Sequence, residues 1–296
     1  MTLIKPFSCR IKRVGVVAKG NIKDCASDLK KIIAIIKKHH KDVYLDENGA
    51  AEMKGQQGHT VPDLLEKCEL IFVLGGDGTL IRVANHLPKK KVLVLGINLG
   101  SLGFLSEIVL KDLDAAMDKI CSRKFMLDRR SMLKVLHFRN GKQINSFYAI
   151  NDAVINQGSF ARLIELKIDV NQRKVISFKA DGLIMATPTG STAHSLSAGG
   201  PVVHPELNAL IFTPMCPSNL ALRPLVVKDD KQITVKVSTR RQDKNYIGLT
   251  IDGQQTVPLK YDDEIKIKKA DRHLYLIRLS GNRFFRDLRK KLGWGN

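Results

Sequence analysis

The sequence has no long apolar segment, few aromatic residues and too few acidic residues to balance its basic ones. No uninterrupted apolar run approaches the roughly 20 residues that a membrane-spanning helix needs. The first 13 residues are basic, and no apolar stretch behind them resembles a signal peptide. We therefore expect a cytoplasmic protein with no membrane partner.

The sequence also lacks the cysteine and histidine patterns of disulfide frameworks and metal sites. Its five cysteines are an odd number, lie far apart and include no Cys-x-x-Cys pair, which argues against a disulfide framework and a structural zinc site. The eight histidines show no paired spacing that would indicate a metal site. We therefore predict no protein-bound metal centre.

Basic residues are in large excess, with 49 Lys and Arg against 29 Asp and Glu, a net charge of +20. Such a surface favours anionic partners such as nucleotides, nucleic acid or polyphosphate and says nothing about the fold. The basic residues occur in short clusters that are not interleaved with base-stacking aromatics, so we interpret each cluster as a solvated face.

Strand and helix patterns alternate in the first third of the chain, which predicts an α/β domain with a parallel sheet over residues 1–124. The length and the 44% hydrophobic content allow two domains with sizeable cores. Residues 48–60 are a polar, glycine-rich segment between the second expected strand and the next helix. The expected strands span 13–18, 42–45, 70–74 and 92–97, and the expected helices span 24–40, 61–67 and 111–122.

The pattern changes from about residue 125, where strand-like runs follow one another with turn signals between them. Asn140-Gly141 is a strong hairpin signal. We predict a mainly β domain over 125–278 with a helix at 191–198, and an amphipathic helix at 284–292 that packs the segment 279–296 back on the first domain. Further strands are expected at 162–170, 174–179, 233–238, 246–251, 264–268 and 274–279.

A glycine turn, residues 75–79 (Gly-Gly-Asp-Gly-Thr), follows the predicted strand at 70–74 and leads into a helix-like run. Glycine permits a sharp turn and lets backbone N–H groups approach an anion at the helix N-terminus. The carboxylate of Asp77 would repel phosphate unless it holds a divalent metal or takes a proton from an attacking hydroxyl. The turn is neither a Walker A loop nor a Gly-x-Gly-x-x-Gly turn, and an ordinary Gly-Asp-Gly loop stays open.

A second segment, residues 181–201, predicts a strand, a polar turn and a helix start. Pro188 and Gly190 fit the turn, and Ser191 or Thr192 can cap the helix. Small residues behind them would let a flat ligand approach the backbone, although a capped helix packed by small residues explains them equally well. Upstream, residues 151–152 (Asn-Asp) offer an amide and a carboxylate suited to a base edge and a ribose diol, but this is also a common turn pair.

Together these segments resemble the NAD kinase family. The glycine turn, the run at 98–105 (Asn-Leu-Gly-Ser-Leu-Gly-Phe-Leu), the Asn-Asp pair and the block at 181–201 occur in the family's order, over nearly the whole chain. Diacylglycerol kinases, sphingosine kinases and phosphofructokinases share a looser form of the turn, but the block at 181–201 argues against them.

The resemblance implies an enzyme that transfers the terminal phosphate of ATP to the 2′-hydroxyl of the adenosine ribose of NAD, giving NADP. Asp77 would be the general base, and Mg²⁺ or another divalent metal would arrive with ATP. The resemblance further implies a homodimer or homotetramer whose partners are NAD and ATP rather than nucleic acid.

The resemblance also implies the site residues. Asn151 and Asp152 would hold adenine and ribose, and Asp181 would hold the nicotinamide end. His194 stands where bacterial members usually carry Tyr, and Lys179 replaces a frequent Arg and lacks its planar fork. The implied NAD contacts are Asp77, Gly78, Asn151, Asp152, Arg162, Lys179, Asp181, Thr192, Ala193, His194, Ser195, Leu196, Ser197 and Gln254, and the implied phosphate contacts are Gly75, Gly76, Gly78, Thr79 and Asp252.

Three other functions remain open on the sequence. A lipid kinase would share the glycine turn but needs an apolar acceptor groove, for which residues 181–201 offer no apolar run. A nucleic-acid-binding protein would use the +20 charge and bind less tightly as salt rises. A non-catalytic NAD sensor would bind the dinucleotide without turnover.

Overall fold

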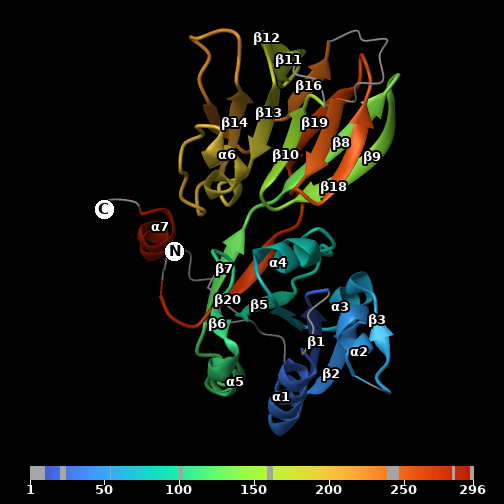
Figure 1. Ribbon diagram of the computed structural model, residues 1–296, viewed down its shortest axis with the longest axis vertical. Coiled ribbons are helices and arrows are strands. Elements are labelled where there is room, and N and C mark those ends of the chain that lie inside the picture. The colour runs from blue at the N-terminus through green and yellow to red at the C-terminus, as the bar shows by residue number, and fades with distance from the viewer. Residues whose placement is uncertain are drawn as a thin grey trace. The chain divides into compact units, whose positions relative to one another are not determined.

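The computed structural model describes residues 11–20, 25–53, 55–99, 103–158, 163–238, 247–281 and 284–293. The chain forms two compact units, which are described separately below (Figure 1). The first unit comprises residues 1–129 and 272–296, and the second comprises residues 130–271. The first observed boundary, between residues 129 and 130, lies a few residues after the expected one near 125. The chain returns to the first unit at residue 272, earlier than the expected boundary after 278.

The first unit contains an eight-stranded sheet in the order β3-β2-β1-β4-β5-β20-β7, with β6 beside β5. The paired registers from β3 across to β20 are parallel. This confirms the predicted α/β architecture with a parallel sheet. The strands are β1 (Arg13–Ala18), β2 (Asp42–Asp46), β3 (Gly58–His59), β4 (Leu70–Leu74), β5 (Leu93–Asn98), β6 (Ile108–Val109), β7 (Met126–Arg130) and β20 (Leu274–Arg278).

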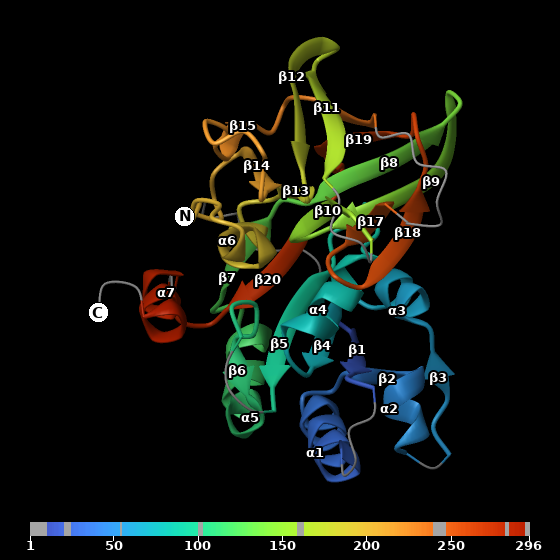
Figure 2. The same cartoon turned by 45° about the horizontal axis from the view of Figure 1, so that its top comes forward.

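Helices cover both faces of this sheet, which explains why its central strand β4 is apolar throughout and fully buried. The apolar stripe of α1 and that of α5 join one core with β1, β4 and β5, and these two helices lie side by side in Figures 1 and 2. The helices are α1 (Cys25–Lys38), α2 (Glu47–Ala51), α3 (Val61–Lys67), α4 (Asp77–Ala84), the 3₁₀ turn η1 (Leu110–Asp112), α5 (Leu113–Cys121) and α7 (Phe284–Leu292).

The strand order reverses direction at β1, which pairs with β2 on one side and β4 on the other. In open parallel sheets, ligands bind outside the carboxyl ends of the strands at such a switch point. The glycine turn directly follows β4, so the fold places it at this edge of the sheet.

The second unit contains two six-stranded antiparallel sheets, in the orders β15-β14-β13-β10-β17-β18 and β12-β11-β16-β19-β8-β9. One apolar core contains side chains of both sheets, which confirms the predicted mainly β domain. The strands are β8 (Leu133–Arg139), β9 (Lys142–Ala149), β10 (Asp152–Asn156), β11 (Ile164–Val170), β12 (Arg173–Ala180), β13 (Gly182–Ala186), β14 (Ala209–Met215), β15 (Leu225–Lys228), β16 (Ile233–Val237), β17 (Ile247–Ile251), β18 (Gln255–Leu259) and β19 (Glu264–Lys269).

In the second unit, the sequence predicted one hairpin and one helix from local patterns. Asn140 and Gly141 have φ values of +50° and +74° and connect β8 to β9, as the hairpin prediction requires. The helix expected at 191–198 is two short pieces, the 3₁₀ turn η2 (Gly190–Thr192) and α6 (His194–Ser197). The break follows the unusual backbone of Ala193, with φ −104° and ψ −132°.

One sequence prediction about the first unit was wrong. The strand expected at 274–279 in the β domain is β20, which joins the parallel sheet beside β5. The start of the polar segment 48–60 is part of α2, which buried Asp46 caps by accepting a hydrogen bond from Gly49 N at 2.9 Å. None of the helices in the described part of the chain is long and apolar enough to cross a bilayer.

Candidate functional site

The glycine turn begins where β4 ends, and Gly75 makes it possible. Gly75 has φ +150°, and a Cβ on it would lie 2.7 Å from Thr79 Oγ1, closer than real contacts allow. Its N–H donates to the carbonyl of Ile97 on β5 at 3.0 Å, which ties the turn to the neighbouring strand. This position therefore requires glycine.

The other two glycines of the turn leave space above the N-terminus of α4. Gly76 and Gly78 are exposed, and a Cβ added to either would meet nothing within 4 Å. Gly76 is the N-cap of α4 and supplies no side-chain cap. An anion can therefore approach the helix N-terminus, where backbone N–H groups and the helix dipole favour negative charge.

Asp77 is the first residue of α4, and its carboxylate is held by the chain 27 and 28 residues further on. Phe104 N donates to Oδ2 at 2.9 Å, and Leu105 N donates to Oδ1 at 3.2 Å. A Cβ on Gly103 would lie 1.9 Å from Oδ1, so glycine is needed for this close approach. Because the side chain remains partly exposed and a carboxylate has about four lone-pair sites, it can still accept a proton.

In the second unit, Asp252 organises the turn that carries Asn151 and Asp152. Its carboxylate accepts hydrogen bonds from the backbone N–H groups of Ile150, Asn151 and Asp152 at 2.9, 2.8 and 3.0 Å. Asp252 is only 9% exposed and sits in a turn with φ +50°. The expected direct contact of Asp252 with phosphate does not suit this carboxylate, because it is buried and occupied by three amides. We assign it the positioning of the Asn-Asp turn.

The turn at residues 187–190 (Thr-Pro-Thr-Gly) packs against the backbone of the Asn-Asp turn. Thr187 N donates to Asn151 O at 2.8 Å, and Thr187 Oγ1 donates to Ile150 O at 2.5 Å. A Cβ on Gly190 would lie 2.2 Å from Asn151 O. The structure thus brings together the Asn-Asp pair, the turn that follows β13 and Asp252, three segments far apart in the sequence.

The two carboxylates in this cluster have raised pKa values. Burial, with a further contribution from the charge of Asp252, raises the pKa of Asp152 to about 7. Burial also raises the pKa of Asp252, to about 6, against the opposing effect of its three amide donors. Because those amides favour the Asp252 anion, Asp152 is the member of the pair that holds a proton near neutral pH.

The side chains of residues 192–197, which follow this turn, differ in their exposure to solvent. Thr192 and Ala193 are partly exposed, as is Leu196, whereas His194 and Ser197 are exposed. Ser195 is fully buried, and its Oγ lies 2.8 Å from Thr213 Oγ1. Its side chain therefore has a packing role, which the sequence did not distinguish from the expected NAD contact.

Asp181 and Lys179 lie at the other end of β13 from the Asn-Asp turn. In the β10–β13 register, Asp152 pairs with Ala186 and Asn156 with Gly182, so Asp181 precedes the far end of the strand. Five residues of strand span roughly 17 Å. Gln157 Nε2 donates to Asp181 Oδ1 at 2.7 Å, and Lys179 is exposed. The chain does not bring these two residues to the Asn-Asp turn.

Two further predicted contacts complete the list. Gln254 is exposed and lies two residues after Asp252 in the β17–β18 turn, near the Asn-Asp turn that Asp252 holds. Arg162 lies outside the described residues. Thr187 and Gly103 were not expected as site-building residues. The signal for Gly103 was the lack of a side chain, which allows the close approach of Asp77, whereas nothing in the sequence indicated the Thr187 contacts.

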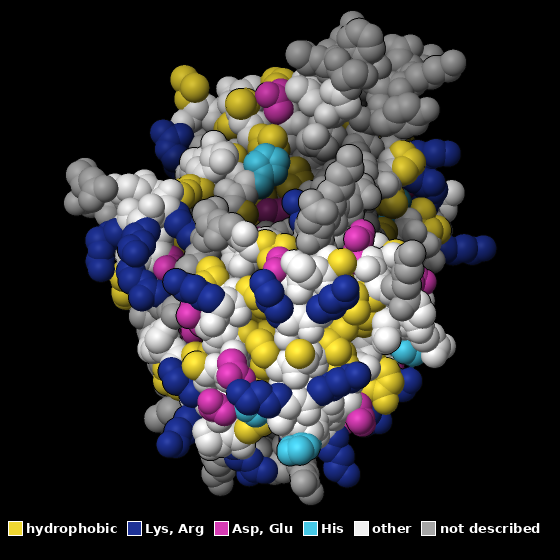
Figure 3. Space-filling view, turned by 60° about the horizontal axis from the view of Figure 1, so that its bottom comes forward, with side chains coloured by type: hydrophobic (Ala, Val, Ile, Leu, Met, Phe, Trp, Pro, Cys, Tyr) yellow, Lys and Arg dark blue, Asp and Glu magenta, His cyan; other side chains and the backbone are white. Residues whose placement is uncertain are grey.

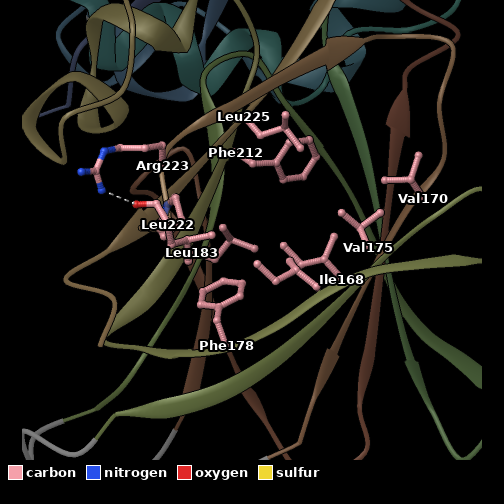
Figure 4. A pocket seen from close by; sticks show the side chains of 11 residues that line it. Ile168, Val170, Val175, Phe178, Leu183, Phe212, Leu222, Arg223 and Leu225 are labelled. Carbon is pink, nitrogen blue, oxygen red and sulfur yellow. Dashed lines mark hydrogen bonds between the residues drawn. The ribbon is translucent and has the colours of Figure 1, made fainter. Parts of the chain in front are cut away.

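An apolar cavity of about 240 Å³ lies in the second unit, away from these residues. Strands of both sheets contribute to its wall, and Arg223 at its side donates to backbone carbonyls of its own loop (Figure 4). It is lined by Ile168, Val170, Val175, Ile176, Phe178, Leu183, Phe212, Pro214, Leu222, Arg223 and Leu225. None of the predicted NAD contacts reaches it.

Lys and Arg side chains are spread over the face drawn in Figure 3, among acidic and apolar ones, as expected for solvated clusters. Within the residues that the structure describes, no group of three or more His, Cys, Asp or Glu could hold a metal ion.

Comparisons with known proteins agree with this architecture. Residues 17–125 match the ATP-NAD kinase N-terminal domain, and residues 150–279 match the ATP-NAD kinase C-terminal domain. The NAD kinase of Syntrophotalea carbinolica is 41% identical over 96% of this chain and 99% of its own length. The NAD kinase of Geotalea daltonii is 38% identical over the same shares of the two chains.

Two solved structures share the fold. Yeast NADH kinase, solved in complex with NADH, superposes with a TM-score of 0.87 at 25% identity, covering 98% of this chain and 89% of the yeast chain. An NAD kinase from Archaeoglobus fulgidus in complex with ATP has a TM-score of 0.73 at 26% identity, covering 95% and 98% of the two chains. Because both domain models match and the relatives named above are up to 41% identical over nearly the whole chain, the chain belongs to the NAD kinase family of phosphotransferases.

Proposed function

We propose that the protein transfers the terminal phosphate of ATP to the 2′-hydroxyl of the adenosine ribose of NAD, giving NADP and ADP, with Asp77 as general base. The observation that supports this most directly is the partly exposed Asp77 carboxylate, fixed by two backbone amides at the open N-terminus of α4. The complexes of the yeast neighbour with NADH and of the archaeal neighbour with ATP support both substrates.

The proposed reaction is an in-line displacement. The ribose oxygen forms a bond to the terminal phosphorus, the bond from that phosphorus to the bridging oxygen breaks, and ADP leaves. Asp77 accepts the hydroxyl proton, and the N–H groups at Gly76 and Gly78 interact with the phosphates. Because phosphoryl transfer needs little covalent help from the protein, positioning and charge stabilisation do most of the work.

Magnesium, or another divalent cation, enters as part of the ATP complex in this proposal. The described residues offer Asp77 but no cluster of carboxylates, which fits a cation held mainly by substrate phosphates and water. The bound cation would neutralise charge on the transferring phosphate.

For the dinucleotide, we propose that Asn151 and Asp152 bind adenine and ribose in the geometry that Asp252 and Thr187 impose. Asp181 is proposed to bind the nicotinamide end, with Thr192, Ala193 and Ser197 lining that part of the pocket. The further proposed NAD contacts are His194, Leu196, Gln254, Lys179 and Arg162. A homodimer or homotetramer and a cytoplasmic location stay predictions, the first checked by light scattering on the purified protein.

The first experiment incubates the purified protein with NAD, ATP and Mg²⁺ and measures NADP. Formation of NADP supports the proposed function. Binding of NAD without turnover would support a sensor instead. Phosphate transfer to a lipid alcohol, or salt-sensitive binding of nucleic acid with no NADP formed, would replace the proposal by one of those functions.

Asp77→Asn tests the general base. Loss of a general base typically costs about 10²- to 10⁴-fold in rate, so turnover should fall by at least 10²-fold while the NAD dissociation constant changes little. Asp118→Asn is the matched control, because its carboxylate on α5 is 75% exposed. Near-normal NADP formation by Asp77→Asn would remove Asp77 from the mechanism.

A further inference from the structure

The glycine turn contains a negative charge and no positive one. Asp77 is the one charged residue among positions 75–79, yet the proposed donor brings several negative phosphate oxygens to this place. A helix N-terminus offers only about half a positive charge, which does not offset a full carboxylate charge. Phosphate-transfer sites normally add a Lys, an Arg or a metal ion that neutralises the transferring group.

Lys291, on the C-terminal helix α7, lies over the segment that holds Asp77. Its Nζ is 4.3 Å from the centroid of the Phe104 ring. The backbone N–H of the same Phe104 donates to Asp77 Oδ2 at 2.9 Å. One residue thus contacts both the candidate base and a lysine that is 214 positions away from that base in the sequence.

The packing of α7 fixes which of its basic residues faces this segment. Leu288 is 1% exposed, and α7 belongs to the first unit. Residues three apart lie on the same helix face, so Lys291 sits on the buried side with Leu288. Arg289 and Lys290 are exposed, whereas Lys291 is partly buried.

The electrostatic surroundings of Lys291 agree with this placement. Burial lowers its pKa and the charge of Arg278 lowers it further, whereas the charges of Asp77 and Asp287 raise it. Arg278 is itself bound to Glu107 and Asp128, at 3.2 and 3.0 Å. Arg278 therefore has carboxylate partners already, and Lys291 is the better candidate for a phosphate.

We propose that Lys291 binds the transferring phosphate group of the nucleoside triphosphate and supplies the cation that the glycine turn lacks. This role rests on the proposed kinase function. The contact with Phe104 holds Lys291 only weakly, because a partly exposed cation–π contact contributes little, so ATP can draw the lysine away from the ring. The long, flexible side chain can then turn its ammonium group from the ring to the phosphate.

Lys19 is the competing source of positive charge. It is exposed at the end of β1, and its Cβ would lie 3.2 Å from a Cβ placed on Gly75. Lys19 directly follows β1, which lies beside β4 in the sheet. Lys291 instead lies over Phe104, whose backbone N–H holds Asp77. Lys19→Met therefore belongs in the same experiment.

The test compares Lys291→Met with Lys290→Met, the same change one residue earlier on the exposed side of α7. We expect Lys291→Met to lower kcat/KM for ATP by about tenfold or more, because it removes a charged hydrogen-bond donor to the phosphate. The KM for NAD and the melting temperature should match those of Lys290→Met. Lys291→Arg should recover part of the loss, since it keeps the charge.

A second measurement uses the unmodified sequence and does not depend on folding of a variant. Wild-type protein is acetylated at its lysines with and without Mg-ATP, and each site is quantified by mass spectrometry. Mg-ATP should protect Lys291 and leave Lys290 unprotected.

The inference is overturned if wild-type protein forms NADP but Lys291→Met behaves like Lys290→Met, if Lys19→Met alone carries the ATP defect, or if Mg-ATP leaves Lys291 unprotected. A wild-type protein that forms no NADP would instead refute the proposed function, so the two failures are distinguishable.

Discussion

Asp77 in the first unit and Asp252 in the second are both carboxylates held by backbone amides, and they differ in how much of the side chain remains accessible. Asp77 accepts two amides and stays partly exposed beside open glycines. Asp252 accepts three amides and is 9% exposed. The motif is the same, an aspartate that fixes a loop distant in the sequence.

The difference separates a group that can react from a group that positions others. A buried carboxylate with its oxygens occupied gains stability from its donors and cannot approach a substrate without losing them. An exposed carboxylate held by two donors keeps its orientation and can still take a proton. The following experiments test whether Asp77 acts in the reaction and Asp252 only positions other residues.

The largest effect is expected for Gly103→Ala in the first unit. Its Cβ would lie 1.9 Å from Asp77 Oδ1, so the carboxylate must move out of its amide cradle. A displacement of about 1 Å at a reacting group can cost roughly 10²-fold, and we expect NADP formation to fall by about that factor. Gly281→Ala, where a Cβ meets nothing within 4 Å, is the control. Equal rates for the two variants would show that the orientation of Asp77 does not matter.

Asp252→Asn should act on stability rather than on the chemical step. The amide side chain has one oxygen for three N–H donors and turns its own N–H₂ toward them, so at least one buried donor loses its partner. Such a loss costs about 1–3 kcal/mol, which urea unfolding of the protein would detect. Asp230→Asn is the matched control, since its surface ion pairs with Lys228 and Lys231 contribute little. Unchanged stability in Asp252→Asn would remove its positioning role.

The sequence pointed to both carboxylates but could indicate the surroundings of the first one only. Asp77 sits in a short glycine turn after an apolar strand, and that local pattern predicts a phosphate site. The role of Asp252 depends on three amides about 100 residues away, at positions 150–152, and no local pattern carries that contact. The resemblance placed Asp252 in the site but gave it a phosphate contact.

The same limit applies to the fold. Local periodicity located strands such as β1 and β4 and the hairpin at Asn140-Gly141, because these depend on neighbouring residues. It could not assign β20 to a sheet, since Leu274–Arg278 is an apolar strand in either unit and only pairing with β5 decides. It also could not show that β13 separates Asp181 from the Asn-Asp turn, because that separation depends on the pairing of β10 with β13.

A pH experiment tests the buried pair in the second unit. In the folded protein the pKa of Asp152 is about 7 and that of Asp252 about 6, both above the ordinary aspartate value near 3.8. Between pH 4 and 7 the folded state therefore binds more protons than the unfolded state, so the unfolding free energy should fall as pH rises and level off above pH 7.

Asp152→Asn keeps the neutral form of the group that holds the proton and should flatten this pH slope. Urea unfolding at several pH values measures it, with Asp230→Asn as the control that keeps the wild-type slope. An unchanged slope in Asp152→Asn would show that the pKa of Asp152 is not raised in the folded protein.

The smallest effect separates two serines on α6 that the sequence treated alike. Ser195 is fully buried with its Oγ 2.8 Å from Thr213 Oγ1, whereas Ser197 is exposed. Ser195→Ala should lower stability by about 1 kcal/mol, since a buried hydroxyl pair is broken, and leave the KM for NAD unchanged. Ser197→Ala should do the reverse, raising that KM with no loss of stability. A raised KM in Ser195→Ala at normal stability would mean that α6 rearranges to bring the buried hydroxyl to the dinucleotide, and burial would then be a poor guide to which residues bind.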